Sequence, residues 1–97
     1  MILEVDVHDV THPLLDVRTD EEWADAHVEG AVHIPMHELT SRLDELPEHR
    51  PLSVICHVGQ RSAVVTEWLV EQGIYAQNVR GGMVAWAHAG LPMESGD

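Results

Sequence analysis

The feature that most constrains the fold is a strand-like apolar segment followed closely by a helical one, within residues 51–73. "PLSVIC" (51–56) is a continuous apolar run, which is typical of a central parallel strand because helices cover such strands on both faces. "SAVVTEWLVEQG" (62–73) has helical periodicity and ends at Gly73, a natural helix stop. Its apolar stripe comprises Val64, Val65, Trp68 and Leu69. The order strand, short loop, helix predicts one βα unit of a parallel sheet.

Similar segments alternate along the rest of the chain. Short apolar or alternating runs predict strands at 3–7, 14–17, 30–35 and 76–79. Helices are expected at 20–26, 36–46 and 83–89. Thr19 and Glu22 form a capping box for the first of these helices, and the spacing of Leu39, Leu43 and Leu46 gives the second one apolar face. The alternation predicts an α/β fold with three α/β/α layers and a mostly parallel central sheet of about five strands.

The chain has 97 residues, enough for one compact domain and too few for two. We therefore expect a single domain over 1–97, with the tail 93–97 disordered. No stretch is long and apolar enough to cross a bilayer, and the N-terminus carries acids where a secretory signal would carry basic residues. These features predict a cytoplasmic protein.

The formal net charge is -12, and the five basic residues are all arginines. Phosphate neutralisation needs clustered cations, so this composition argues against nucleic-acid or anionic-membrane binding. Any anion site must be built locally, against the field of the whole molecule. Together with the family precedent discussed below, the acidic surface makes a monomer the default expectation.

Cys56 is the only cysteine, so it cannot form an internal disulfide. It is either a small buried apolar residue that completes a core strand or a reactive thiol. If residues 56–61 form a loop before a helix that starts near Ser62, backbone N–H groups can point at the sulfur. Gly59 would let the loop fold tightly, and Arg61 would close the ring with its fork of donors. Such a ring would favour the thiolate.

Three blocks of the sequence resemble the rhodanese-like domain family, in order and at the usual separations. They are "LLDVRTDEEWADAHVEGAVHIP" (14–35), "CHVGQRS" (56–62) and "NVRGGMVAW" (78–86). The resemblance implies a single-domain sulfurtransferase that takes sulfane sulfur from thiosulfate or a persulfide. It passes that sulfur to cyanide, a small thiol or the thiol of a partner protein. No metal and no organic cofactor is implied.

The resemblance also implies the roles of the loop residues. Cys56 would be the catalytic nucleophile that carries the persulfide. The donor would be bound by the six residues after it: His57, Val58, Gly59, Gln60, Arg61 and Ser62. Many members that use thiosulfate carry additional basic residues in this loop, whereas this chain has histidine and glutamine there. We therefore expect a persulfide to be as good a candidate donor as thiosulfate.

Two other functions remain open. The related phosphatases and arsenate reductases have five residues between cysteine and arginine, whereas four separate Cys56 from Arg61, which disfavours phosphatase or oxyanion-reductase chemistry. A non-catalytic interaction or regulatory module is the second alternative. The presence of Cys56, Gly59 and Arg61 argues against this module, because a site without catalytic activity does not require a ring of donors around the sulfur.

Several other polar and aromatic residues are interpreted as structural. Arg18 is expected to pair with Glu22, with Asp16 beside it as framework. His27 is expected to be a hydrogen-bonded corner residue. Two histidine pairs have the i, i+4 spacing of a helical metal site, but Pro35 lies between His33 and His37, and Pro13 follows the pair His8 and His12. No metal pair is therefore expected. Gly81 and Gly82 should turn the chain so that the last helix lies beside the cysteine loop. The tryptophans are expected in the core, with Trp86 the one that lines the pocket.

Overall fold

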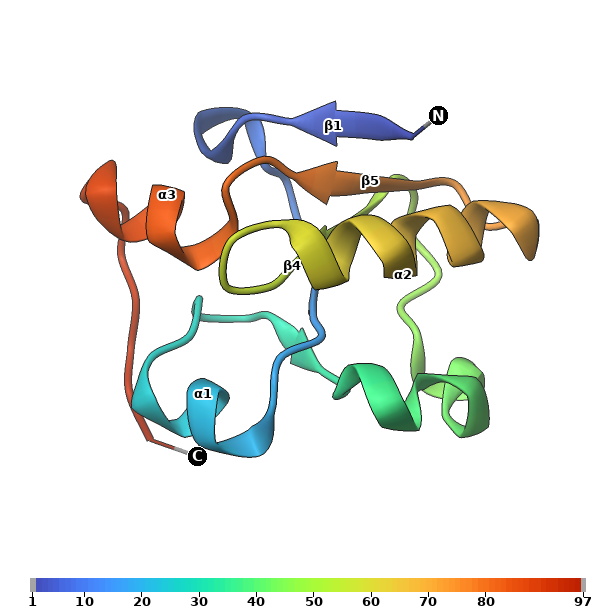
Figure 1. Cartoon of the computed structure of the whole chain (residues 1–97), viewed down its shortest axis with the longest axis horizontal. Helices are drawn as coiled ribbons and strands as arrows, with labels where there is room; N and C mark the ends of the chain where they lie inside the picture. Colours follow the sequence, from blue (N-terminus) through green and yellow to red (C-terminus); the bar gives the residue numbers. More distant parts are fainter. Residues whose placement is uncertain (1, 97) are drawn as a thin grey trace.

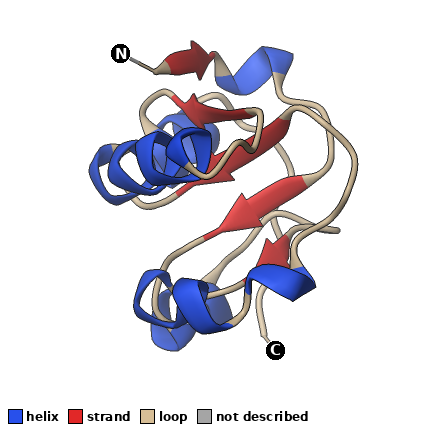
Figure 2. Ribbon diagram, turned by 90° about the vertical axis from the view of Figure 1, so that its right-hand side faces the viewer, coloured by secondary structure: helices blue, strands red, loops and turns tan. Residues whose placement is uncertain are grey.

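The computed structural model describes residues 2–96 and contains a five-stranded sheet in which all neighbouring strands are parallel (Figure 1). The strands are β1 (Leu3–Val5), β2 (Leu14–Asp16), β3 (Val32–His33), β4 (Leu52–Ile55) and β5 (Ala76–Val79). Their order across the sheet is β1-β5-β4-β2-β3. The predicted α/β class and the parallel sheet are therefore confirmed, with β4 in the centre. Figure 2 shows the strands crossing the middle of the molecule, with β1 at one edge beside the N-terminus.

Helices cover both faces of this sheet. They are α1 (Asp20–Asp25), α2 (Gln60–Glu71) and α3 (Gly82–His88), with the 3-10 helices η1 (Val7–Asp9), η2 (Met36–Ser41) and η3 (Leu43–Glu45). On one face Val65 and Leu69 of α2 pack with Leu39 of η2 against the sheet. On the other face Met83 and Trp86 of α3 form a second cluster. The core therefore has two layers, one on each side of β4.

Strand β4 is buried on both faces, as its continuous apolar sequence predicts. Leu52, Val54 and Cys56 belong to the cluster under α2, whereas Ile55 belongs to the cluster under α3. This alternation follows from the two-residue period of side chains in a strand. Each large side chain that is removed from water in this way contributes roughly 1.5–3 kcal/mol. The rigid strand fixes the position from which the cysteine loop begins.

The predicted helix over 36–46 is wrong. The segment forms η2 and η3, which meet at Arg42, and its backbone bonds span three residues, as from Arg42 N–H to Leu39 C=O. The side chain of Arg42 bonds Glu38 and Glu45, and this bridge holds the break between the two short helices. The three leucines nevertheless pack against the α2-side core, as their spacing predicts.

Other boundaries differ by a few residues. The strand expected at 3–7 ends at Val5, because Asp6 caps η1 by accepting from His8 N–H. The strand expected at 30–35 is paired only over Val32–His33. Helix α2 begins at Gln60, two residues before the expected start. No helix within residues 2–96 has the length and apolar character needed to cross a membrane.

Disorder of 93–97 stays a prediction. Residue 97 lies outside the described residues, and the segment before it is placed along α1. There Glu94 forms an antiparallel bridge with His27, and Gly96 N–H donates to Ala24 C=O. Both contacts hold the end of the described chain against the turn that follows α1.

Candidate active site

Cys56 stands at the carboxyl end of β4, where a short loop leads into α2. Ligands of parallel α/β sheets bind beyond this end of the strands. Gly59 is the residue before α2 and has a φ of 101°, a left-handed conformation that favours glycine. A side chain at Gly59 would also approach Gly81 N to 3.3 Å. The glycine therefore allows the loop both to turn tightly and to pack against the start of α3.

Three donors of the loop and helix point at the Cys56 sulfur. Gly59 N–H lies 3.2 Å from Sγ, Ser62 N–H lies 3.3 Å away, and Ser62 Oγ lies 3.2 Å away. Because α2 begins at Gln60, the N–H groups of its first turn have no partner within the helix and are free to face the sulfur. The amides therefore face the thiol, as the sequence analysis requires.

These donors lower the pKa of Cys56. Burial raises the pKa, because the side chain has 0% exposure and a thiolate loses hydration. Hydrogen bonds from the Ser62 hydroxyl and from the backbone of Ser62, Gly59 and Arg61 lower the pKa by more than burial raises it. The net result is a thiol with a pKa below its ordinary value, although it finishes a core strand.

The turn at Gly81–Gly82 fixes the other side of the loop, as predicted. The first turn of α3 donates to the loop carbonyls, with Met83 N–H 2.8 Å from Cys56 O and Val84 N–H 3.0 Å from His57 O. A side chain at Gly82 would lie 2.7 Å from His57 O and closer still to Cys56 O. Only glycine lets the two backbones approach in this way.

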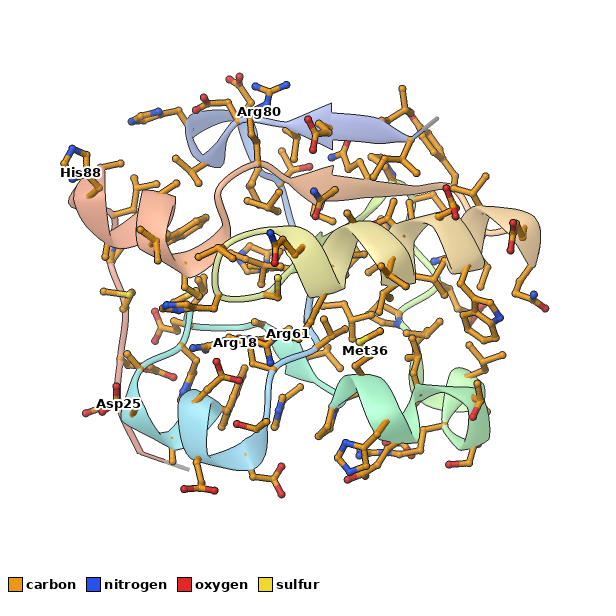
Figure 3. All side chains as sticks on the ribbon, in the orientation of Figure 1. Arg18, Asp25, Met36, Arg61, Arg80 and His88 are labelled. Carbon is orange, nitrogen blue, oxygen red and sulfur yellow. The ribbon has the colours of Figure 1, made fainter. Side chains whose placement is uncertain are left out.

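The Arg61 guanidinium does not close the ring over the sulfur. Its two terminal nitrogens form a fork on Glu22 of α1, with Nη1–Oε1 at 2.8 Å and Nη2–Oε2 at 2.9 Å. In Figure 3, Arg61 lies between the cysteine loop and α1. The expected pairing of Arg18 with the Glu22 side chain is therefore wrong, because Arg61 occupies that carboxylate.

Arg18 pairs instead with Asp16 at the end of β2. Both side chains are buried, and Arg18 Nη2 lies 2.8 Å from Asp16 Oδ2. The guanidinium also donates to two backbone carbonyls of α1 and its end, Glu22 O at 3.2 Å and Ala26 O at 2.6 Å. These bonds bind β2 to α1, which supports the structural interpretation of Asp16 and Arg18.

The Glu22–Arg61 pair shifts the pKa of both groups. Hydrogen bonds from Arg61, with a smaller contribution from the Thr19 backbone, lower the pKa of Glu22 to about 2 against the opposing effect of partial burial. The pKa of Arg61 is raised, first by Glu22 and also by the negative charge of a Cys56 thiolate. Glu22 is therefore ionised throughout the ordinary pH range.

The buried polar residue Asn78, which lies behind the sulfur, was not predicted from the sequence. Asn78 of β5 is 2% exposed and its Oδ1 accepts from Ser62 Oγ. Its Nδ2 donates to Glu4 Oε2 at 3.1 Å and to Gly59 O at 3.3 Å. The available signal was a polar residue within the apolar strand pattern of 76–79. The hydrogen-bond partners of Asn78 depend on the strand order, which places β1 beside β5.

Two open hollows flank the cysteine loop. One, of about 420 Å³, is lined by Val17, Thr19, Pro35, Met36, His37 and Arg61. The other, of about 560 Å³, is lined by residues of α3 and of the α1 end, together with Arg18, His57 and Met93. Trp86 does not line the hollow beside His57. It lies on the buried face of α3, and its Nε1–H donates to Pro92 O, so the expectation that it lines the pocket is wrong.

The remaining residues singled out from the sequence have structural contacts. His27 is buried, with Nδ1 2.8 Å from Trp23 O and Nε2 3.2 Å from Glu94 Oε1, so it is the hydrogen-bonded corner residue expected. Trp23 stacks on His27 and on His33. Val58 and Gln60 are exposed at the loop surface.

Comparison with known proteins identifies the family. The sequence profile of the "Rhodanese-like domain" matches residues 3–89. This chain belongs to the rhodanese-like domain family. It is 39% identical over 82 residues to a "Sulfurtransferase" of Allochromatium vinosum, covering 82% of this chain and 76% of that protein. It is 35% identical over 83 residues to "Thiosulfate sulfurtransferase GlpE" of Actinobacillus pleuropneumoniae, covering 84% of this chain and 77% of that protein.

A solved structure shares the whole fold. A rhodanese-related protein from Thermoplasma volcanium superposes with a TM-score of 0.89 at 28% identity, covering 95% of this chain and 97% of that one. Together the rhodanese-like match and the named relatives support sulfurtransferase activity for this chain in general.

Proposed function

We propose that this rhodanese-like domain transfers sulfane sulfur from thiosulfate or a persulfide, through a persulfide on Cys56, to cyanide or a thiol. The observation that carries the proposal is the convergence of Gly59 N–H, Ser62 N–H and Ser62 Oγ on one sulfur. Donors fixed in this way stabilise an anion without reorganising during the reaction. Thiolate and persulfide are both such anions.

The reaction has two balanced steps. The Cys56 thiolate attacks the terminal sulfur of the donor, so that a new S–S bond forms and the bond between that sulfur and the rest of the donor breaks. The leaving group takes the bonding electron pair and departs as sulfite from thiosulfate or as a thiolate from an organic persulfide. The acceptor then attacks the outer sulfur, and Cys56 leaves as thiolate. No oxidant or reductant is consumed.

The loop residues would act in this cycle through their backbone and their position. The amides from Gly59 to Ser62 would hold the charge on sulfur, and His57, Val58 and Gln60 would form the mouth that the donor meets. Cys56 has no exposed surface, so the donor reaches it when the loop opens locally. Hydrogen bonds from α3 to the carbonyls of Cys56 and His57 hold the loop in the closed form.

Intact-protein mass spectrometry tests the proposal. After incubation with thiosulfate, polysulfide or the persulfide of 2-mercaptoethanol, the wild-type protein should gain the mass of one sulfur atom. Cyanide should remove that atom as thiocyanate. Cys56→Ser should gain nothing, since Cys56 is the only thiol in the chain. A wild-type protein that takes up sulfur from none of the three donors would contradict the proposal.

A non-catalytic interaction module is the second candidate. It is favoured by the complete burial of the thiol and by the engagement of Arg61 with Glu22. The rate of alkylation of Cys56 against pH separates the two functions. A midpoint near the pKa of a free cysteine, about 8.5, would favour the module, whereas a lower midpoint is expected for a sulfur carrier.

A further inference from the structure

One arginine lines each of the two hollows beside the cysteine loop, Arg61 in one and Arg18 in the other, and both are paired with carboxylates. Of the residues lining the Arg61-side hollow, Arg61 alone is permanently charged. Both of its terminal nitrogens bond Glu22 at 2.8 and 2.9 Å, in the bidentate geometry that suits guanidinium and carboxylate best. Two of the five N–H donors of Arg61 are therefore occupied, and the Glu22 carboxylate neutralises the charge that an incoming anion would meet.

The other cations of the chain do not replace it. Arg18, Arg42 and Arg80 are each paired with carboxylates. Arg50 precedes β4, at the end of that strand opposite to Cys56, and donates to the carbonyls of Pro47 and His49. A dianion that approaches the cysteine loop consequently meets a neutralised pair in a molecule with a formal net charge of -12.

The surface beside Arg61 is largely apolar. Val17, Pro35 and Met36 line the hollow together with Thr19 and His37. Met36 also lines a second hollow of about 230 Å³, whose other walls are Leu39, Thr40, Val64, Val65 and Trp68. Carbon-rich walls fit the organic part of a donor and offer nothing to the charged oxygens of thiosulfate.

We propose that Glu22 is a specificity-determining residue, which engages the Arg61 guanidinium and so makes organic persulfides better sulfur donors than the dianion thiosulfate. This inference rests on the proposed function and names the donor class of the same site. With an organic persulfide, R–S–SH, the Cys56 thiolate takes the terminal sulfur and R–S⁻ departs with the electron pair. Cys56–S–SH remains, so atoms and charge balance. Glu22 acts through Arg61, and its effect is therefore on the choice of donor.

The sharpest variant is Glu22→Gln. Glutamine is isosteric and retains the oxygen that accepts from Thr19 in the capping box, so α1 keeps its N-terminal cap. It removes the negative charge that holds Arg61. The matched control is Glu21→Gln, which makes the same change of charge at the neighbouring exposed residue of the same helical turn.

The measurement is kcat/KM for thiosulfate and for 2-mercaptoethanol persulfide with each protein. In the wild type we expect the persulfide to be favoured at least about tenfold. Glu22→Gln should reduce that preference by about tenfold or more, because one freed charge–charge contact at about 4 Å is worth at least that factor near a protein surface. Glu21→Gln should keep the wild-type preference. A change in the pKa of the Cys56 thiol affects the reaction with both donors. The ratio of the two kcat/KM values therefore reports how the site recognises the charge of the donor.

A second readout does not depend on sulfur transfer. Alkylation of Cys56 by iodoacetate, an anion, is compared with alkylation by neutral iodoacetamide. The ratio of the iodoacetate rate to the iodoacetamide rate should rise in Glu22→Gln, because the freed Arg61 attracts the anion. In Glu21→Gln this ratio should stay at the wild-type value. Thermal unfolding of each variant shows that the comparison is made between folded proteins.

The outcomes separate this inference from the proposed function. A wild type that loads sulfur but prefers thiosulfate overturns the inference alone, whatever the variants do. Equal donor preference in wild type and Glu22→Gln, or an equal change in Glu21→Gln, also overturns it alone. Absence of sulfur loading from every donor overturns the proposed function and the inference together.

Discussion

Ser62 places two donors near one sulfur, but its hydroxyl has a competing acceptor. Ser62 Oγ lies 3.2 Å from Cys56 Sγ and also bonds Asn78 Oδ1. The amide of Asn78 is held in this orientation, because its Nδ2 bonds Glu4 and the carbonyl of Gly59. A hydroxyl has one proton to donate. The backbone N–H groups of Gly59 and Ser62 have no such competing acceptor in the described part of the chain, so they stabilise the thiolate more consistently than the Ser62 hydroxyl does.

Removal of the Ser62 hydroxyl should make the thiol less acidic. The pKa of Cys56 is held below its ordinary value partly by that hydroxyl, so in Ser62→Ala the midpoint of alkylation against pH should move upward. At a fixed pH below the wild-type midpoint, the alkylation rate should fall by roughly threefold to tenfold. A hydrogen bond to a charged group contributes about 1.5 kcal/mol or more, and the higher nucleophilicity of a less acidic thiolate offsets part of the loss.

The control for this change is Ser53→Ala. Ser53 is another buried serine, on β4, and its hydroxyl accepts from Gln77 without contacting the sulfur. The midpoint of the control should equal that of the wild type. If Ser62→Ala left the midpoint in place, the backbone amides alone would account for the acidity of the thiol.

At the scale of elements, the cysteine loop is held between β4, α2 and α3. Strand β4 fixes where the loop starts, the first turn of α2 supplies donors to the sulfur, and the first turn of α3 supplies donors to the loop carbonyls. The close approach of Gly82 to the carbonyls of Cys56 and His57 joins the last helix to the site. Substitutions in that turn should therefore affect both stability and sulfur loading.

Gly82→Ala and Gly73→Ala make a matched pair at this scale. Both glycines have positive φ, 56° and 84°, but a side chain at Gly73 would meet nothing within 4 Å. Gly73→Ala should cost about 1–2 kcal/mol for the left-handed backbone alone. Gly82→Ala adds the clash with the loop carbonyls, for a total of about 2–5 kcal/mol.

Chemical denaturation gives the stability of each variant, and intact mass gives its sulfur loading. Loading should slow in Gly82→Ala under conditions where the protein remains folded, and should be unchanged in Gly73→Ala. Equal stabilities for the two variants would show that α3 does not hold the loop as described.

At the scale of the whole molecule, the excess of negative charge should oppose dianionic donors. The formal net charge is -12, and the molecule measures 33 × 25 × 22 Å. The Debye length is about 30 Å at 0.01 M ionic strength and about 8 Å at 0.15 M. At low salt, charges over the whole molecule therefore act on an approaching ion, whereas at higher salt only those near the site do.

The dependence on salt follows from this field. Between about 0.01 M and 0.15 M ionic strength, kcat/KM for thiosulfate should rise by roughly threefold to tenfold, because screening weakens long-range repulsion. The value for 2-mercaptoethanol persulfide, whose carbon part is uncharged, should change less. A fall with salt for thiosulfate would mean that an unpaired cation attracts the donor, contrary to the pairing of Arg61 with Glu22.

Local sequence patterns predict most of the helices and strands and place Cys56 at the end of a central strand. The apolar run of β4, the capping box at Thr19 and the stripe of α2 are local patterns, so they predict elements without knowledge of the fold. Gly59 and the first turn of α2 follow Cys56 directly, which is why the donors to the sulfur could be anticipated. The helix over 36–46 was wrong because leucine spacing does not separate an α-helix from two 3-10 helices joined at Arg42.

The partners of the polar side chains follow from tertiary packing and are not visible in local sequence patterns. Glu22 lies 39 positions before Arg61, and Glu4 lies 74 before Asn78. Arg61 has several acids among its possible partners, and the packing of α1 beside the cysteine loop selects Glu22. The strand order likewise places β1 against β5 and so joins Glu4 to Asn78 and Ser62. Hydrogen bonds act over about 3 Å, so their partners are set by the packing of distant segments.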